Sequence, residues 1–443
     1  MASTYLTHTP NSTGNRRTWT MSVWMKISAN TQSMDIMGCG GSSDQNHIQI
    51  ETDKLTVRHY NGSANDIRLN SVRSFRDNNA WYHLVVRMDT TQSTEADRLR
   101  IYINGEQITQ FNSPTYPSQN YDWDFMQNGV TQYIGRQGHN NGNHWNGLLS
   151  HFHWCDGYSY APTEFGETDA TTGEWKIKTS PSVNYGTNGF LILKDGNTIT
   201  DQSSNSNDWS LGAGTLTKTE DCPSNVFATM NPLFPMGSAV TFSNGNTSIS
   251  TSNTSFRMFA STLGISSGKF YWEMKPTPNA GGDYCHFGIL DSGQFDNDTY
   301  VAVKSQGYVY LNDGRKNNNG TATSYGDSYG NNDIIGVALD MDNKKLYFAK
   351  NGTWQNSGVP TSGSTGTGAA FTVATPNSGA YVVAVSIYAQ SGVTDPKLQF
   401  NFGNGYFGTT AVASAGTNAS GIGIFEYDTP TGYTALSTKG LNE

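Results

Sequence analysis

The stretch that decides the fold is RLRIYINGEQIT, residues 98–109. Every second residue from Leu99 to Ile103 is aliphatic, and the pair Asn104-Gly105 follows directly. An Asn-Gly pair between alternating runs is the strongest local sign of a hairpin, because both residues tolerate the positive φ of a type I′ turn. The sequence therefore predicts two antiparallel strands here, joined by a two-residue turn.

The same pattern recurs near residue 350, where Leu346 and Phe348 alternate in a run that ends at Asn351-Gly352. Further strands are predicted at Tyr82–Met88, Ile335–Met341, Tyr381–Ala389 and Leu398–Phe402. Helical periodicity longer than two turns is not found. These patterns predict an all-β fold made of two tandem antiparallel β-sandwich (jelly-roll) domains.

Composition agrees with many turns and few helices. Charged residues make up 14% of the 443 residues, against about 25% in an average soluble domain. Gly is abundant, with 48 residues, and aromatic residues reach 12%. We place the domain boundary at Asp221/Cys222, which gives domains 1–221 and 222–443, each of which can bury a sizeable core. Thr409–Gly423 is rich in Gly, Ala and Ser and is predicted to be a loose C-terminal arm.

Charge and hydropathy exclude several partners. The net charge is −9, with 27 basic against 36 acidic residues, so nucleic acid is excluded as a partner because its phosphates need Lys and Arg. No apolar stretch approaches the ~20 residues of a membrane span, and residues 1–13 show no export-signal pattern. The cysteines, Cys39, Cys155, Cys222 and Cys285, are too scattered for a disulfide framework. We expect reduced thiols and folding in a cytoplasm.

The first half resembles a concanavalin A-like, laminin-G-type jelly roll as it occurs in bacteriophage virion proteins. Two distinctive strings carry this resemblance, FGETD at 165–169 and YGTNGF at 185–190. The strings TPNSTGNRRTWT at 9–20, WYHLV at 81–85, YING at 102–105 and YIGR at 133–136 precede them in the same order.

The second half resembles a SPRY domain, another β-sandwich. The matching strings are SGKFYWE at 267–273, FGI at 287–289, DIIGVALD at 333–340, LYFAKNG at 346–352 and FNFG at 400–403. The ending TPTGYTAL at 429–436 is similar to the close of the same phage proteins. Residues 409–425 look like an insertion, so no role is carried over to them. Coiled-coil heptads are not found, which favours a compact piece fixed to a capsid or tail over a long fibre shaft.

Concanavalin-like sandwiches include glycan-cleaving enzymes, so a carboxylate pair is a candidate. Glu164, Glu167 and Asp169 come closest, but their neighbouring glycines indicate a turn, and catalysis is not expected. Four histidines, His139, His144, His151 and His153, lie within 15 residues. His151 and His153 could share a strand face and bind one metal, although surface or hydrogen-bonded histidines are favoured.

No cofactor is assigned, and calcium is left open. Laminin-G-like folds often hold calcium with loop carboxylates. Asp122 with Asp124, Asp296 with Asp298, and Asp340 with Asp342 are the acidic pairs. None has the full calcium-loop pattern, and such turns are common without metal.

Aromatic rings beside amides and carboxylates are the candidate ligand-binding groups, because rings cover the apolar faces of sugars and amides pair with hydroxyls. For each ring, a position in the core is the alternative. The candidate residues are Tyr121, Asp122, Trp123, Asp124, His144, Trp145, Tyr325 and Tyr329.

The resemblance implies a non-enzymatic phage virion protein, displayed on the particle as capsid decoration, fibre or adsorption component. It would be assembled in the host cytoplasm and exposed on the particle surface. Its expected partners are other virion proteins and host-surface glycans or proteins, and a homo-oligomer is left open. The alternative is a virion-associated polysaccharide-cleaving hydrolase.

Overall fold

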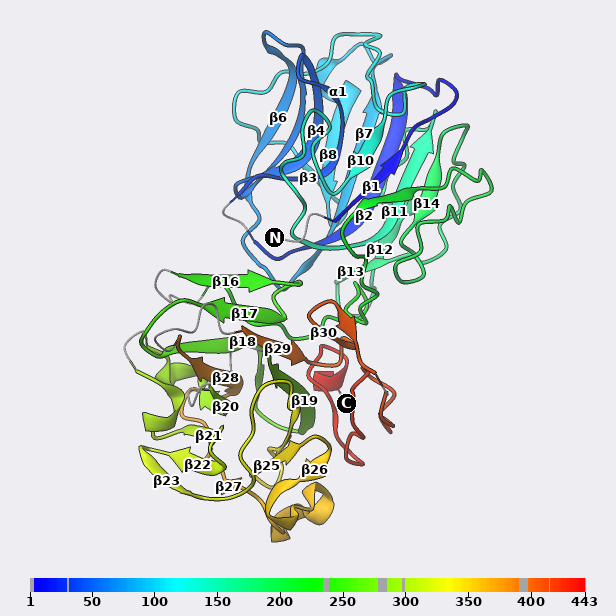
Figure 1. Cartoon of the computed structure of the whole chain (residues 1–443). Helices are drawn as coiled ribbons and strands as arrows, with labels where there is room; N and C mark the ends of the chain where they lie inside the picture. Colours follow the sequence, from blue (N-terminus) through cyan, green and yellow to red (C-terminus); the bar gives the residue numbers. More distant parts are fainter. Residues whose placement is uncertain are drawn as a thin grey trace. The chain divides into compact units, whose positions relative to one another are not determined.

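A computed structural model describes residues 4–29, 32–233, 239–277, 285–296, 299–389, 397–413 and 415–442. The chain divides into two compact units, Met1–Lys218 and Thr219–Glu443, whereas the sequence placed the boundary after Asp221. Within the described ranges, no helix has the length and apolar character needed to cross a membrane. Each unit is nearly all β, as predicted (Figure 1).

The first unit consists of two antiparallel sheets around one core. The seven-stranded sheet runs in the order β15 (Ser210–Ala213), β1 (Tyr5–His8), β10 (Gln132–Ile134), β3 (Met34–Gly41), β4 (Asp44–Glu51), β5 (Lys54–Tyr60), β6 (Asn65–Ser74). The six-stranded sheet runs β14 (Phe190–Ile192), β11 (Gly147–Asp156), β2 (Thr18–Ile27), β7 (Trp81–Asp89), β8 (Leu99–Ile103), β9 (Glu106–Ile108). A hairpin of β12 (Gly166–Thr168) and β13 (Trp175–Ile177), the helix α1 (Glu95–Arg98) and the 3-10 turn η1 (Pro162–Glu164) complete the unit.

The predicted hairpin at 98–109 is confirmed. Strands β8 and β9 pair antiparallel, and the turn residues Asn104 and Gly105 have φ values of 50° and 81°. A Cβ on Gly105 would lie 2.6 Å from the ring of Trp175. The turn therefore needs glycine both for its backbone conformation and for its contact with β13.

The seven-stranded sheet separates apolar and polar residues by the strand period of two. Ile48, Leu55 and Val57 are fully buried in the core. His47 and Arg58, one residue away on β4 and β5, point to the opposite, outer face and lie directly across from one another. The two ends of the unit also meet in this sheet, because β1 pairs antiparallel with β15.

The second unit is a second sandwich with its own core. One sheet runs β16 (Val240–Ser243), β17 (Ser248–Thr251), β29 (Lys397–Asn401), β19 (Lys269–Pro276), β24 (Ile335–Asp340), β25 (Lys345–Lys350), β26 (Thr353–Trp354), with β27 (Phe371–Thr372) on β25 and β32 (Thr434–Ala435) on β19. The other runs β18 (Arg257–Ile265), β28 (Tyr381–Ile387), β20 (Cys285–Asp291), β21 (Gly307–Leu311), β22 (Arg315–Asn318), β23 (Thr321–Ser324). The small hairpin β30 (Tyr406–Phe407) and β31 (Thr410–Ala411) and the 3-10 turns η2 (Ser292–Gln294), η3 (Val301–Val303), η4 (Gln355–Ser357), η5 (Pro360–Thr365) and η6 (Gly440–Asn442) complete it.

The strands predicted for this half are confirmed as β24, β25, β28 and β29. Asn351 and Gly352 form the predicted turn, with φ values of 47° and 80°. The strand predicted to continue to Ala389 ends at Ile387.

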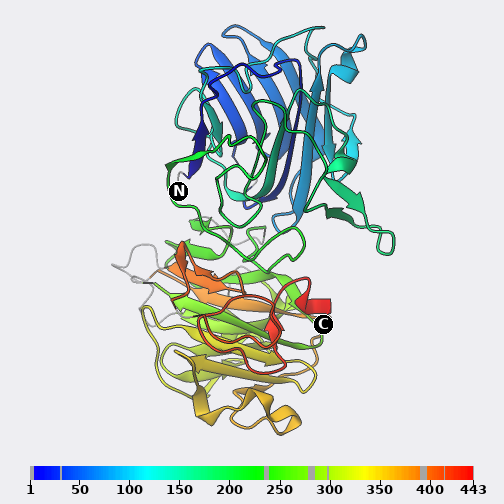
Figure 2. The ribbon, with the colours of Figure 1, turned by 90° about the vertical axis from the view of Figure 1, so that its right-hand side faces the viewer.

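The C-terminal segment, red in Figure 2, lies against the strands of its own unit. Phe425 and Tyr433 are buried with Tyr271 of β19 in a second apolar cluster. The backbone amides of Glu426 and Tyr427 donate to the buried carboxylate of Glu273. The segment from Phe425 to Tyr433 is thus held against the sandwich, whereas the described residues of 409–423, the predicted loose arm, are exposed or half-buried.

Candidate functional site

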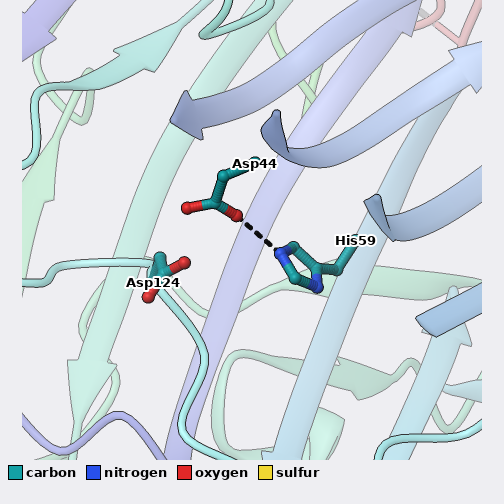
Figure 3. Close-up of side chains that lie close together, drawn as sticks. All are labelled: Asp44, His59 and Asp124. Atoms are coloured by element: carbon teal, nitrogen blue, oxygen red, sulfur yellow. Dashed lines mark hydrogen bonds and ion pairs between the residues drawn. The ribbon is translucent and has the colours of Figure 1, made fainter. Parts of the chain in front are cut away.

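One cluster of ionisable side chains gathers at the end of the seven-stranded sheet of the first unit (Figure 3). Asp44 begins β4, His59 lies near the end of β5, and Asp124 belongs to the loop before β10. One ligand atom from each of the three lies within 4.8 Å of the others. The Nε2 atom of His59 is 2.6 Å from Oδ1 of Asp44.

Local packing places each group. His59 follows Leu55 and Val57 on the core-facing side of β5, and it is 5% exposed. Asp124 follows Trp123, whose ring is buried in the core and whose indole N–H donates to the side-chain oxygen of Asn46 on β4. Arg16 forms an ion pair with Asp124 and also donates to the backbone oxygen of Trp123. The loop is therefore fixed to the sheet at two consecutive residues.

A second set of contacts orients His59 from its other nitrogen. Its Nδ1 atom lies 2.5 Å from Oδ1 of Asp66 and 2.7 Å from the hydroxyl of Tyr121. Both ring nitrogens therefore face oxygen atoms. A carboxylate on the far nitrogen of a histidine is the arrangement that orients the imidazole in metal sites.

Electrostatics couple the two cluster carboxylates. Burial and a hydrogen bond with Asp44 raise the pKa of Asp124 to about 6, although Arg16 acts in the opposite direction. Burial also acts to raise the pKa of Asp44, but hydrogen bonds with His59 and Asp124 lower it overall. The pair holds its negative charge at close range, which favours either a shared proton or a bound cation.

The donor atoms of the cluster differ from those of a calcium site, which the sequence left open. Asp44 and Asp124 offer the carboxylate oxygens that calcium takes, but the third group is an imidazole. Calcium takes oxygen ligands, whereas imidazole with carboxylates suits manganese or zinc. The three residues therefore fit a transition-metal dication better than calcium.

The four consecutive residues predicted to bind a ligand, at 121–124, have four different surroundings. The hydroxyl of Tyr121 contacts His59, and Asp124 belongs to the cluster. Asp122 is exposed and accepts two hydrogen bonds from Arg17, at 2.9 and 3.0 Å. Trp123 is fully buried, so the expectation that its ring faces a ligand is wrong: the ring fills the core.

The predicted aromatic residues of the second unit are also core residues. Tyr325 and Tyr329 are 9% and 5% exposed. The hydroxyl of Tyr329 donates to the backbone oxygens of Cys285 and Tyr310. The prediction of a ligand-binding role is therefore wrong for both rings, since the sandwich interior covers them. In the first unit, His144 and Trp145 are half-buried, and the ring centroid of His144 lies 6.0 Å from that of Tyr5.

The two histidines considered as metal ligands, His151 and His153, make hydrogen bonds within the protein. His151 and His153 lie beside a register shift in β11, and their Nδ1 atoms contact the hydroxyls of Ser150 and Tyr185. These two histidines are thus hydrogen-bonded, as favoured.

The acidic residues Asp340 and Asp342 accept hydrogen bonds from the backbone. Asp340 accepts from the backbone of Asn343, and Asp342 accepts from that of Gly268. Asp298, the partner predicted for Asp296, lies outside the described residues.

Sequence reasoning missed Asp44, His59 and Asp66. The available signal was the spacing of Leu55, Val57 and His59, since a histidine on an aliphatic strand face needs polar partners. The partners themselves come from a neighbouring turn, a bulged strand and a distant loop, and no local pattern marks them.

The comparisons with known proteins assign a domain type to each unit. Residues 1–164 match the family model described as the concanavalin A-like lectin/glucanases superfamily, and residues 269–404 match the SPRY domain. The chain is 35% identical over 92 residues to the ATP-dependent RNA helicase Ddx1 of Drosophila melanogaster, a stretch that covers 21% of this chain and 12% of the helicase.

Solved structures match at lower identity. The SPRY domain of human HERC1 is 19% identical, with a TM-score of 0.28, over 36% of this chain and 91% of that one. Stonustoxin is 18% identical, with a TM-score of 0.29, over 39% of this chain and 27% of that one. The assignment of the second domain rests on the family model.

Proposed function

From a concanavalin A-like domain followed by a SPRY domain, both of binding type, we infer that the chain is a non-enzymatic structural and recognition protein displayed on a bacteriophage particle. It would contact neighbouring virion proteins and bind a glycan or protein of the host surface. Many copies on one particle would turn weak individual contacts into strong attachment.

The succession of two binding-type sandwiches in one chain carries this proposal. The pKa values and ion pairs of the candidate acidic residues support this proposal over the alternative of a glycan-cleaving hydrolase. A glycan-cleaving acid needs a raised pKa, but hydrogen bonds from the backbone of Thr172 and Thr171 lower the pKa of Asp169 to about 2. The ammonium of Lys176 lies 3.4 Å from Glu167 and 3.2 Å from Asp169, so both carboxylates form ion pairs with it.

In the Asp44–Asp124 pair, one carboxyl group, that of Asp124, has a raised pKa. The ligand atoms of the pair lie within 4.8 Å of one another. Retaining hydrolysis places its carboxyl groups about 5–5.5 Å apart, with the sugar bond between them. The ligand oxygens of Asp44 and Asp124 are therefore closer together than the carboxyl groups of a retaining hydrolase.

The location is tested by mass spectrometry and antibody labelling of purified particles. We expect the protein in intact virions, with labelling on the particle surface. Its absence from purified particles would overturn the proposal.

The absence of catalysis is tested by incubating the full chain with host surface polysaccharide and measuring reducing ends. We expect no product above the buffer blank. Product formation that disappears in Glu164→Gln or Glu167→Gln would favour the hydrolase instead.

A further inference from the structure

A row of polar residues crosses the outer face of the seven-stranded sheet in the first unit. Strand register places Tyr133, Gly38, His47, Arg58 and Arg68 directly beside one another, on β10, β3, β4, β5 and β6 in turn. Side chains of one such row share a face. This row lies on the face opposite to the core-facing side of β5.

Several buried polar atoms in this region have no hydrogen-bond partner among the described residues. His47 is 2% exposed; its Nδ1 atom lies 2.6 Å from Oδ1 of the buried Asp35, and its Nε2 atom has no partner. Arg136 is 9% exposed and its Nε atom is buried without a partner. The Nε atom of Arg58 and the Nδ1 atom of His139 are in the same state. A buried polar group without a partner is costly, so a polar ligand that contacts these groups would be stabilised.

These groups form one cluster. The rings of His47 and His139 lie 5.7 Å apart, edge to face. Burial lowers the pKa of His139; the charges of His47, Arg58 and Arg136 lower it further, while Asp35 acts in the opposite direction. All four groups are therefore within electrostatic range of His139.

A close approach of the loop at 136–139 to β3 holds the cluster together. A Cβ on Gly38 would lie 3.0 Å from the backbone nitrogen of Gly138, and a Cβ on Gly138 would lie 2.3 Å from the backbone of Cys39. Because both positions are glycine, the loop can lie directly on the strand. The guanidinium carbon of Arg136 then lies 3.9 Å from the ring centre of Tyr133.

The charges around the cluster indicate which ligand chemistry it favours. Among the described residues, neither Arg58 nor Arg136 has a carboxylate within ion-pair distance, whereas Arg68 is paired with Glu51 at 2.9 Å. One terminal nitrogen of each of the first two arginines donates to an amide oxygen, of Gln45 and of Asn141, but both buried Nε–H groups lack an acceptor among the described residues. Guanidinium groups suit carboxylates and sulfate-like oxyanions and disfavour a cation at this place.

His47 adds a second requirement for the ligand. The Nε2 atom of His47 has no partner among the described residues, and a ligand hydroxyl suits it because a hydroxyl can both donate and accept. An anion that also carries hydroxyls is an acidic sugar. We propose that the outer-face cluster of His47, Arg58, Arg136 and His139 binds an acidic glycan through a carboxylate or sulfate ester and a neighbouring hydroxyl. This inference rests on the proposed glycan-binding function and adds the class of glycan.

The test measures binding of the full chain to three immobilised polymers: alginate as a polyuronate, dextran sulfate as a sulfate ester, and uncharged dextran. We expect binding to at least one acidic polymer, weakening as salt increases, and none to dextran. Alginate alone would identify the carboxylate as the recognised group, and dextran sulfate alone the sulfate. Binding to neither acidic polymer would overturn the proposal.

The matched variants are the double change Arg58→Gln with Arg136→Gln and the control Arg73→Gln, an exposed arginine of β6. We expect the double variant to lose about tenfold or more in affinity, since each removes a charge-assisted contact, and the control to stay within about twofold. His139→Ala, on the loop, tests the cluster without altering the sheet and should also weaken binding. Unchanged affinity in the double variant and in His139→Ala, or an equal loss in the control, would overturn the proposal.

The site and the proposed function can fail separately. If the chain is absent from virions but the acidic-polymer binding follows these variants, the virion function fails and the site stands. If particles carry the chain and it binds host cells equally well after the double change, the function stands and the site is wrong.

Discussion

Glu273 on β19 should make the stability of the second unit depend on pH, and Glu273→Gln should remove that dependence. The carboxylate is fully buried and accepts four hydrogen bonds. Two come from the backbone amides of Glu426 and Tyr427, both at 2.9 Å. The others come from the hydroxyl of Tyr271 at 3.1 Å and the amide of Asn401 at 3.0 Å.

Burial outweighs these bonds and raises the pKa of Glu273 from 4.5 to about 7. One pKa unit corresponds to about 1.4 kcal/mol, so the whole shift amounts to about 3 kcal/mol. Below pH 4.5 the group is protonated in both states and the folded unit has its full stability. Between pH 4.5 and 7 the unfolded chain loses the proton while the folded unit retains it, so the free energy of unfolding falls as pH rises.

The assay is urea unfolding of the full chain at pH 4.5, 6 and 8, followed by a short deuterium pulse at one fixed pH and mass spectrometry of β19 and β24 peptides. Relative to the wild type, Glu273→Gln should gain about 3 kcal/mol between pH 4.5 and 8. The matched control Glu426→Gln removes a charge from the half-buried neighbour and should show no such gain. Curves for wild type and Glu273→Gln that stay parallel to within about 0.5 kcal/mol would refute the reasoning.

Three further predictions concern the first unit. Manganese at about 100 times its Kd should stabilise the wild type by about 2.7 kcal/mol, seen as a rise in Tm, and should leave Asp44→Asn unchanged; an equal rise in both would exclude this cluster. Trp123→Ala should reduce the free energy of unfolding by about 3–5 kcal/mol in urea titrations, and a loss below about 1 kcal/mol would contradict its place in the core. Gly105→Ala and Gly129→Ala both place a side chain at positive φ, but only the first meets a ring, that of Trp175. We therefore expect a larger loss of Tm for Gly105→Ala than for Gly129→Ala, and the difference measures the contact with Trp175. Equal losses would show that backbone strain alone matters.

Strands and turns of this chain follow from local sequence because their signals are local. Asn104-Gly105 and Asn351-Gly352 need only their own backbone preferences to form the turns observed. Alternation likewise placed β7, β24 and β25, since each strand buries one face.

The site residues depend on contacts that local sequence does not contain. Tyr121 and Trp123 are two residues apart, yet one hydroxyl reaches His59 and the other ring enters the core. How deeply the loop at 121–124 packs against the sheet decides which of the two side chains enters the core. Tyr329 looked like a loop aromatic, but its hydroxyl closes onto Cys285 and Tyr310 inside the second sandwich. Polar neighbours in sequence therefore did not indicate exposure.

The pairing of β1 with β15 has a mechanical consequence. Tyr5, near the start of the unit, lies opposite Ala213, near its end, so a tether pulling on both ends would load the hydrogen bonds between these strands one after another. Hydrogen bonds that are loaded one after another break one at a time, at a lower force than hydrogen bonds that are sheared together. Under tension the first unit would therefore release β15 early and lengthen at its own terminus, before its core strands β2, β7 and β11 carry the load.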